Sequence, residues 1–374
     1  MKQIFSFLTF ASIVLVIFFS GTCKNDSPVK PPPPPVSPDT TSHEYEWRAW
    51  LVGGWGTHLD DVFALSPDFA IAVGEIDDSS EYPRPHNCYI WNGTDLEPYS
   101  LPINNNDTVT INSNYSDNII NSIWMFRRDN IWYAMDNKST YAHLTIAEGD
   151  TNIKSESNLV RTDINGAIGQ RIFAKDTNDI FFGGTLGAVI QYHNNNWTRY
   201  NLETARNYVT DLWGLTSNNV YMCANGGDRG FFYRYDGAAW NLLWTDYLPS
   251  LSDSVFFGQI TSIWGVQDQD SIWTAGLWLG KMKKDGTGKI KIIRSLQPYG
   301  ILRIRGSKCN NVFFVGGMGA ILHYNGSTLH FYDEFYGNDW ILNSLTVLEN
   351  DVFIVGRIYG AKAGVFIHGK RIHK

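Results

Sequence analysis

Side chains that could do acid–base or binding chemistry gather in one polar segment of the chain. Asp77, Asp78, Glu81, Arg84 and His86 lie there, beside the first copy of the repeat described below. A glycoside hydrolase needs two carboxylates that face each other across a cleft. No spacing among the 37 Asp and Glu residues selects such a pair. We therefore predict a weak candidate binding loop here, with a solvated surface loop as the alternative.

Patterns for a cofactor or a metal are absent from the sequence. The nine His residues do not cluster, and no G-x-S-x-G occurs. The segment that starts at Lys283 looks like part of a calcium loop, but Lys283 and Arg294 occupy positions where that loop needs carboxylates. The glycines of Gly316–Ala320 precede no helix that could bind phosphate. We predict no cofactor, no metal site and no catalytic residue.

Three cysteines follow the N-terminal region, at Cys88, Cys223 and Cys309. Three is an odd number, so at least one thiol stays free, and no C-x-x-C spacing indicates zinc or a redox pair. One disulfide would be compatible with an oxidising compartment, but the sequence does not choose its pair. The alternative is that these cysteines are small buried hydrophobic residues.

An internal repeat dominates the chain. Seven stretches each carry an aliphatic residue, a polar turn with Asp or Asn, and an apolar run that tends to end in Gly. The aliphatic residues are Val62, Ile123, Ile172, Leu212, Ile263, Ile304 and Leu345, and the stretches begin one residue earlier, at Asp61, Ser122, Arg171, Asp211, Ser262, Arg303 and Ser344. A period near 40 residues that lengthens in places indicates a repeat architecture with loop insertions.

Hairpin signals complete each repeat. Asn-Gly or Asp-Gly pairs end at Gly93, Gly237 and Gly326, and a last strand is predicted to begin at Trp197, Trp240 or Leu329. We interpret the stretch that ends at Gly369 as a further hairpin turn. Each repeat then holds about four short strands, which is the composition of a propeller blade.

We predict an all-β fold, a single β-propeller of about seven four-stranded blades; a count of six or eight would also fit. The second repeat is degenerate, with Met135 in place of the final Gly. A segment at His43–Trp50, with Trp47 and Trp50, precedes the first repeat and is expected to complete the last blade and close the ring. Trp124, Trp213, Trp264 and Trp273 recur in the repeats, and packing between blades is favoured over a sugar-stacking platform.

The N-terminal region reads as a targeting segment. Lys2 precedes an uncharged apolar run at Ile4–Phe19, and small residues lead to Cys23. This pattern is typical of a secretory signal, with an uncleaved membrane anchor as the alternative. Pro31–Pro35 then favours an extended polyproline spacer. We divide the chain into a signal peptide (1–22), a lipidation site with a Pro-rich linker (23–42) and a propeller (43–374).

The N-terminal pattern resembles bacterial lipoprotein signals, and the repeats resemble those of propeller lipoproteins of Bacteroidetes-type bacteria. Ser217–Tyr221 with Tyr235–Trp240 carries the repeat resemblance best, and the turn at Asp236-Gly237 partly resembles the Asp-box of sialidase-type and sortilin-type propellers. Thr22 and Ser20 depart from the usual lipoprotein residues. The resemblance implies a lipid on Cys23 and an envelope location, with the outer membrane or cell surface favoured over the cytoplasmic membrane.

Composition limits the function classes. The net charge of −7 is spread without a basic cluster, so no nucleic-acid partner is expected. We predict a monomeric, non-catalytic binding or scaffolding propeller that meets the membrane through its lipid and has a protein or glycan ligand. The alternative is a carbohydrate-active propeller enzyme, either a hydrolase or a lyase.

Overall fold

The computed structural model describes residues 40–77, 86–101, 119–135, 140–145, 169–202, 208–226, 229–247, 259–287, 290–295, 300–360 and 362–372. All regular structure in these ranges is β-strand, as the aromatic, β-branched and Gly-rich composition predicts. None of the described residues forms a helix that is long and apolar enough to cross a membrane.

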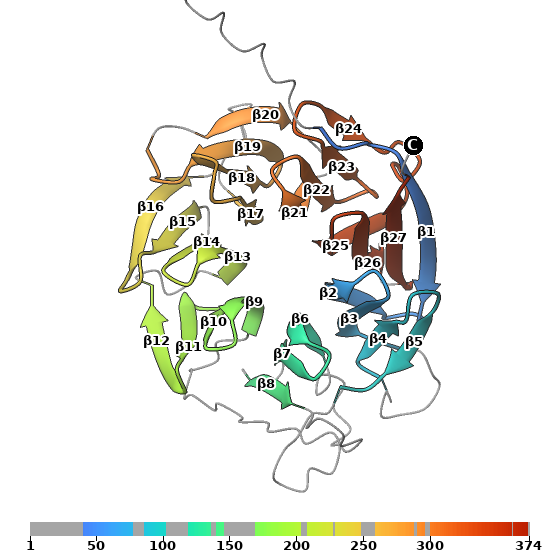
Figure 1. Cartoon of the computed structure of the whole chain (residues 1–374), viewed down its shortest axis with the longest axis horizontal. Coiled ribbons are helices and arrows are strands. Elements are labelled where there is room, and N and C mark those ends of the chain that lie inside the picture. Colours follow the sequence, from blue (N-terminus) through green and yellow to red (C-terminus); the bar gives the residue numbers. More distant parts are fainter. Residues whose placement is uncertain are drawn as a thin grey trace, which may run out of the picture. The chain divides into compact units, whose positions relative to one another are not determined.

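Seven antiparallel sheets are arranged as a ring, with one strand of each near the ring axis (Figure 1). Six sheets have four strands, and the second has three in the described residues. Blades 1 to 3 comprise β2 (His58–Ser66), β3 (Phe69–Glu75), β4 (Cys88–Trp91) and β5 (Leu96–Tyr99); β6 (Ile120–Arg127), β7 (Asn130–Met135) and β8 (Thr140–Thr145); and β9 (Gly169–Asp176), β10 (Asp179–Gly184), β11 (Ala188–His193) and β12 (Asn196–Asn201).

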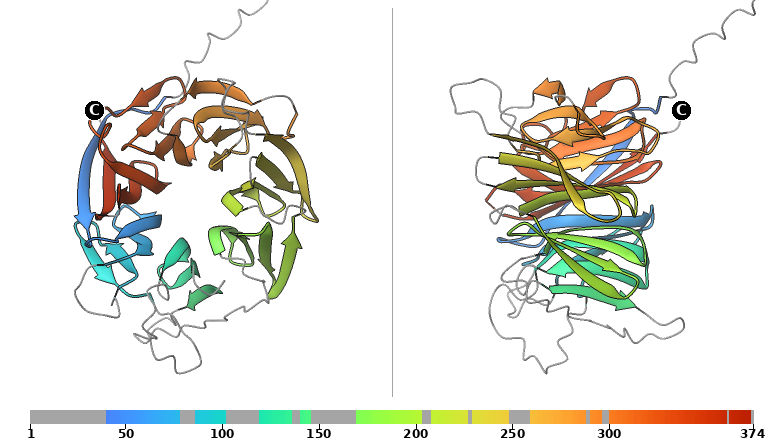
Figure 2. Two further views of the ribbon diagram at one scale, coloured as in Figure 1. Left: turned by 180° about the vertical axis from the view of Figure 1, so that it is seen from behind. Right: turned by 90° about the vertical axis from the view of Figure 1, so that its left-hand side faces the viewer.

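Blades 4 to 7 continue around the ring. They comprise β13 (Tyr208–Thr216), β14 (Asn219–Gly226), β15 (Arg229–Tyr235) and β16 (Trp240–Tyr247); β17 (Ser262–Trp264), β18 (Ser271–Ala275), β19 (Trp278–Lys283) and β20 (Lys291–Ser295); β21 (Ile301–Lys308), β22 (Asn311–Gly316), β23 (Ile321–Tyr324) and β24 (Leu329–Phe331); and β25 (Trp340–Val347), β26 (Asp351–Ile358) and β27 (Gly364–Arg371) with β1 (Tyr45–Val52). Figure 2 shows this ring from behind and edge-on.

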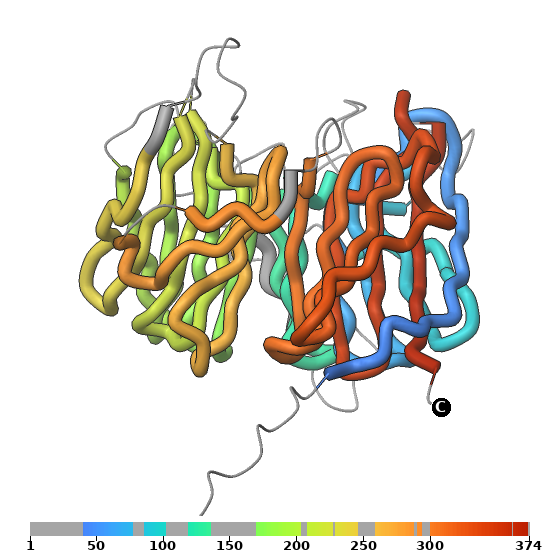
Figure 3. Tube along the Cα trace, turned by 90° about the horizontal axis from the view of Figure 1, so that it is seen from above, coloured from blue at the N-terminus to red at the C-terminus, as the bar shows by residue number. Residues whose placement is uncertain are grey.

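The ring closes as the sequence predicts. β1 pairs antiparallel with β27 over eight residues, from Tyr45 opposite Arg371 to Val52 opposite Gly364. Figure 3 shows β1 running along the outer edge of blade 7. This pairing gives the last sheet its fourth strand and covers the edge of β27.

Seven apolar clusters hold the ring together, one between each pair of neighbouring sheets. The aliphatic repeat residues are central to them, because each is at most 2% exposed except Ile172 at 4%. Burying such side chains contributes about 1.5–3 kcal/mol each. The repeat pattern therefore encodes contacts between blades.

Two sequence predictions about strands differ from the structure. About seven four-stranded blades are predicted, whereas six sheets have four strands and the second has three among the described residues. Gly369 does not end a hairpin but lies inside β27, opposite Trp47. A Cβ atom at Gly369 would lie 2.3 Å from the Trp47 ring, so this glycine makes room for an indole.

Candidate functional site

The axis of the propeller is lined by seven polar residues that occupy one repeat position. Each directly precedes the aliphatic repeat residue on the innermost strand of its blade, and we call them the axial residues: Asp61, Ser122, Arg171, Asp211, Ser262, Arg303 and Ser344. The order Asp, Ser, Arg occurs twice around the ring before the final Ser. Four of them, Asp211, Ser262, Arg303 and Ser122, are at most 1% exposed.

Hydrogen bonds join these residues from blade to blade. Asp61 Oδ2 accepts from Ser122 Oγ at 2.7 Å and from the Ile123 amide at 3.1 Å. Ser122 Oγ in turn accepts from the Ile172 amide at 3.2 Å. Ser344 Oγ donates to Asp61 Oδ1 at 2.6 Å, so this series of hydrogen bonds also joins blade 7 to blade 1.

The same pattern recurs in blades 4 to 6. Asp211 Oδ2 accepts from Ser262 Oγ and from the Ile263 amide at 3.1 Å, and Ser262 Oγ accepts from the Ile304 amide at 2.9 Å. Each polar side chain thus satisfies a backbone amide of the next blade, which would otherwise be buried without a partner.

Two arginines neutralise Asp211. Arg303 Nη1 lies 2.7 Å from Asp211 Oδ1, and Arg305 binds the same carboxylate with both terminal nitrogens at 2.7 and 2.9 Å. Burial alone would raise the pKa of Asp211, but Arg303 and Arg305 outweigh it and hold that pKa well below its usual range. Asp211 is therefore a permanent carboxylate and has no proton to donate at neutral pH.

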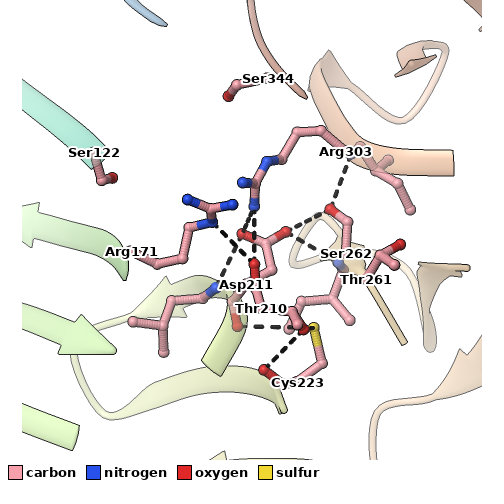
Figure 4. Close-up of polar contacts among 12 residues, drawn as sticks. Ser122, Arg171, Thr210, Asp211, Cys223, Thr261, Ser262, Arg303 and Ser344 are labelled. Atoms are coloured by element: carbon pink, nitrogen blue, oxygen red, sulfur yellow. Dashed lines mark hydrogen bonds and ion pairs between the residues drawn. The ribbon is translucent and has the colours of Figure 1, made fainter. Parts of the chain in front are cut away.

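Arg171 and Arg303 meet from two separate blades. Arg171 Nε donates to the Thr210 carbonyl at 3.0 Å, and Arg303 Nη1 donates to the same oxygen at 3.3 Å (Figure 4). Burial and the neighbouring charge of Arg171 lower the pKa of Arg303 to about 10. In the described part of the chain, Arg303 Nε is buried and has no hydrogen-bond partner.

A cavity of about 290 Å³ opens beside these guanidiniums, and we call it the axial cavity. Its polar lining includes Arg171, Arg303, Arg305, Asp61 and Ser122. Its apolar and aromatic lining is Val62, Phe63, Ala64, Ile123, Trp124, Ile172, Trp213, Leu345, Val347 and Leu348, together with Gly306 and Thr346. An apolar wall with a few converging polar groups is the usual composition of a ligand pocket.

The tryptophans serve packing first. Trp264 and Trp273 are buried in the cluster between blades 5 and 6. Trp213 lies between the rings of Phe173 and Trp264 and donates its indole N–H to the Gly265 carbonyl at 2.9 Å. Trp124 and Trp213 also line the axial cavity. The packing interpretation is confirmed for all four, and two of them in addition face the cavity.

Only part of the predicted binding loop lies within the described residues. Asp78, Glu81 and Arg84 fall outside the described residues, as does Cys23. Asp77 and His86 are described, but neither lines the axial cavity. The Asp77 backbone is held by Thr57, whose Oγ1 accepts from the Asp77 amide at 2.8 Å. The described residues of this loop, Asp77 and His86, are therefore not part of the axial cavity.

The three later cysteines are free thiols. Cys88 and Cys223 are buried, and Cys309 is exposed. Burial raises the pKa of Cys88 to about 12, so this thiol stays protonated and packs as a small apolar side chain. No described group of three or more His, Cys, Asp or Glu residues is placed to hold a metal ion.

A second charged group lies on β2 and β3. His58 Nε2 is 3.4 Å from Asp60 Oδ2, and His58 Nδ1 is 3.7 Å from Glu75. Burial raises the pKa of Asp60 to about 6, against the opposing charges of His58, Arg171 and Arg357. Asp60 thus titrates closer to neutral pH than an ordinary aspartate.

The ring of sheets around a polar axis defines the chain as a β-propeller, and solved structures show the same fold. A structure titled YCF48 bound to D1 peptide aligns with 90% of this chain and 100% of its own, at 15% identity and a TM-score of 0.60. The WD40 propeller domain of Doa1 aligns over 88% and 97%, at 10% identity and a TM-score of 0.59. YCF48 from Cyanidioschyzon merolae aligns over 87% and 98%, at 15% identity and 0.59.

No protein-family model matches this sequence, and no curated protein matches it. These three likenesses are at 15% identity or less and therefore establish the fold alone. A β-propeller supports a binding or scaffolding role in general.

Proposed function

We propose that this chain is a non-catalytic binding propeller, tethered to the bacterial cell envelope by a lipid on Cys23, and that its ligand occupies the axial cavity. The observation that carries the proposal is the axial cavity itself, where an apolar wall meets three guanidiniums that come from two blades. Such a combination buries the body of a ligand and fixes its orientation through a few polar contacts.

The axial carboxylates favour binding over catalysis. A glycoside hydrolase needs one carboxyl group that can donate a proton. Asp211 is held ionised by Arg303 and Arg305, and Asp61 accepts hydrogen bonds from Ser122 and Ser344. The oxygens of both carboxylates are therefore already used in hydrogen bonds and ion pairs with other blades. Of the neighbours, YCF48 has been solved with a peptide bound, which agrees with an envelope protein or peptide as the partner here, beside a glycan.

The binding proposal is tested with arrays of envelope glycans and peptides, using the full chain in detergent. Thr346→Trp places an indole in the cavity and should weaken ligand binding at least tenfold. Arg199→Trp, on the exposed outer strand β12, is the matched control and should bind as the wild type does. A folded Thr346→Trp protein that binds normally would place the ligand elsewhere. Breakdown products from a bound glycan would replace the proposal with the carbohydrate-active enzyme.

The tether is tested by replacing Cys23 with Ala. Lipidation predicts that the wild type fractionates with membranes and carries acyl chains on its first mature residue. The Cys23→Ala protein should lose the acyl mass. If the wild type itself keeps residues 1–22 and carries no acyl mass, the uncleaved anchor is the correct interpretation instead.

A further inference from the structure

We propose that the axial cavity is specific for a small organic acid, a carboxylate attached to an apolar or aromatic body, and that Arg171 and Arg303 bind the carboxylate. This inference rests on the proposed function, because it names the ligand class of the same cavity. The inference also extends the proposed function, because it assigns the two guanidiniums a ligand-binding role in addition to their structural hydrogen bonds.

The first argument is geometric. Arg171 comes from β9 and Arg303 from β21, yet both donate to one oxygen, the carbonyl of Thr210. Figure 4 shows the two side chains extending toward each other, with their guanidinium groups close together beside Asp211. Two guanidiniums held beside one acceptor bring several N–H donors together, and such donors suit the two oxygens of a carboxylate.

The second argument is an unfilled donor. The Arg303 side chain is 1% exposed, and in the described residues its Nε has no partner. A buried donor without an acceptor costs free energy, and a charged one costs more. Because Arg303 lines the axial cavity, an anionic oxygen bound there would compensate the charge of this guanidinium.

The third argument is charge. The charged side chains that line the axial cavity are Arg171, Arg303, Arg305 and Asp61, and the carboxylate of Asp211 pairs with Arg303 and Arg305 beside it. One positive charge is therefore uncompensated, and Arg171 and Arg303 repel each other. A ligand with a single negative charge balances the set, whereas a phosphate dianion overshoots it.

The fourth argument is the wall opposite the guanidiniums. Phe63, Trp124 and Trp213 supply aromatic surface, and Leu345 and Val347 supply aliphatic surface. A cavity of about 290 Å³ holds a small molecule or one residue of a larger ligand, and not a folded element. The ligand is therefore amphipathic, with its acid group toward the axial residues and its apolar body against this wall.

The test is calorimetric titration of the full chain in detergent with three probes: phenylacetate, its neutral analogue phenylacetamide, and inorganic phosphate. We expect phenylacetate to bind and to raise the melting temperature. Phenylacetamide and phosphate should bind at least tenfold more weakly. Equal binding of acid and amide, tighter binding of phosphate, or no binding of phenylacetate would each overturn the carboxylate inference.

Matched variants assign the residue. Arg171 is partly exposed, so Arg171→Gln should fold and should lose at least tenfold in phenylacetate affinity. Arg171→Lys keeps the positive charge but loses the planar guanidinium, so its phenylacetate affinity should lie between those of the wild type and Arg171→Gln. Arg199→Gln, an exposed arginine on β12, should bind as the wild type does. Unchanged affinity in Arg171→Gln overturns the inference.

The two proposals fail separately. If the arrays show a ligand that Thr346→Trp loses but acid and amide probes bind alike, cavity binding stands and only its carboxylate specificity is wrong. If Thr346→Trp keeps the array ligand, the proposed site fails regardless of the probes.

Discussion

Single side chains on the axis connect whole blades, and Asp211 is the strongest case. It belongs to blade 4, accepts from Ser262 and Ile263 of blade 5, and pairs with Arg303 and Arg305 of blade 6. Sequence reasoning found the repeat position but treated these residues only as the start of each repeat. The missed signal was the polar type at all seven places, which gains meaning only when the blades meet at one axis.

Asp211→Ala should lower the free energy of unfolding by about 3–5 kcal/mol, because it leaves Arg303 buried without its counter-charge. Urea denaturation of the full chain measures this loss. The control is Asp95→Ala at an exposed turn, which should change stability by about 0.5 kcal/mol or less. A similar small change for Asp211→Ala would mean that the axial ion pairs contribute little net stability.

We expect His323 to make the stability of the propeller sensitive to acid. It is fully buried, stacks on Phe313, and its Nδ1 lies 2.9 Å from His43 Nδ1. Burial, with the nearby charges of His43 and Arg371, lowers the pKa of His323 from 6.5 to about 2. The unfolded chain therefore takes up a proton below pH 6.5 that the folded chain does not, so stability is lost as the pH falls.

We expect this residue to cost about 1.4 kcal/mol per pH unit below 6.5. Denaturation midpoints between pH 7.5 and 4.5 should fall less steeply for His323→Gln than for the wild type. His193 occupies the equivalent repeat position but is exposed, so His193→Gln should keep the wild-type slope. Parallel profiles for all three proteins would contradict the assignment.

At the scale of the strand, the turn residues explain why the hairpins could be predicted. Asn92, Asp236 and Asn325 each accept two backbone amides in their own turn, and the glycines that follow have φ near +100°. These interactions are local, so the sequence contains them in full. The role of Gly369 could not be predicted from local sequence. A glycine is needed there because of the Trp47 ring, which comes from more than 300 residues earlier in the chain.

The glycine at the end of the second strand of a blade has a steric reason. A Cβ atom at Gly316 would lie 2.0 Å from the Gly300 carbonyl oxygen, and Gly74 and Gly356 stand equally close to a carbonyl of the innermost strand. Gly316→Ala should therefore cost about 2–3 kcal/mol through backbone displacement. Gly360→Ala, in open space with φ of +78°, should cost only about 1 kcal/mol. Equal losses of stability for the two variants in thermal melts would show that the close carbonyl oxygen at Gly316 does not matter.

At the scale of the molecule, closure depends on aromatic contacts of β1. Trp47 packs against Tyr332 of blade 6 at 4.9 Å and Phe335 at 5.4 Å between ring centroids. Trp47→Ala should lower stability by about 2–3 kcal/mol and make β1 the first site of limited proteolysis. Trp55→Ala is the control, since Trp55 is 78% exposed. An unchanged cleavage pattern would mean that backbone pairing alone keeps the ring shut.

The all-β class, the repeat and the closing strand could be predicted because each depends on patterns along the chain. The axial cavity could not, because its lining comes from six of the seven blades and exists only once they are placed around one axis. Blade 2 shows the same limit, since its described residues form three strands and not the four that the sequence predicts. Its repeat lacks the local turn signals that the other repeats provide.

The pairing of β1 with β27 also sets an order in time. A ribosome that adds roughly 5–20 residues per second makes β1 some 15 to 60 seconds before its partner, which lies more than 300 residues downstream. During that interval the hydrogen-bonding edge of β1 is exposed and unpaired, because β27 has not yet been made. A nascent chain of this kind gains from a holding chaperone, and its final step is the meeting of its oldest and youngest strands.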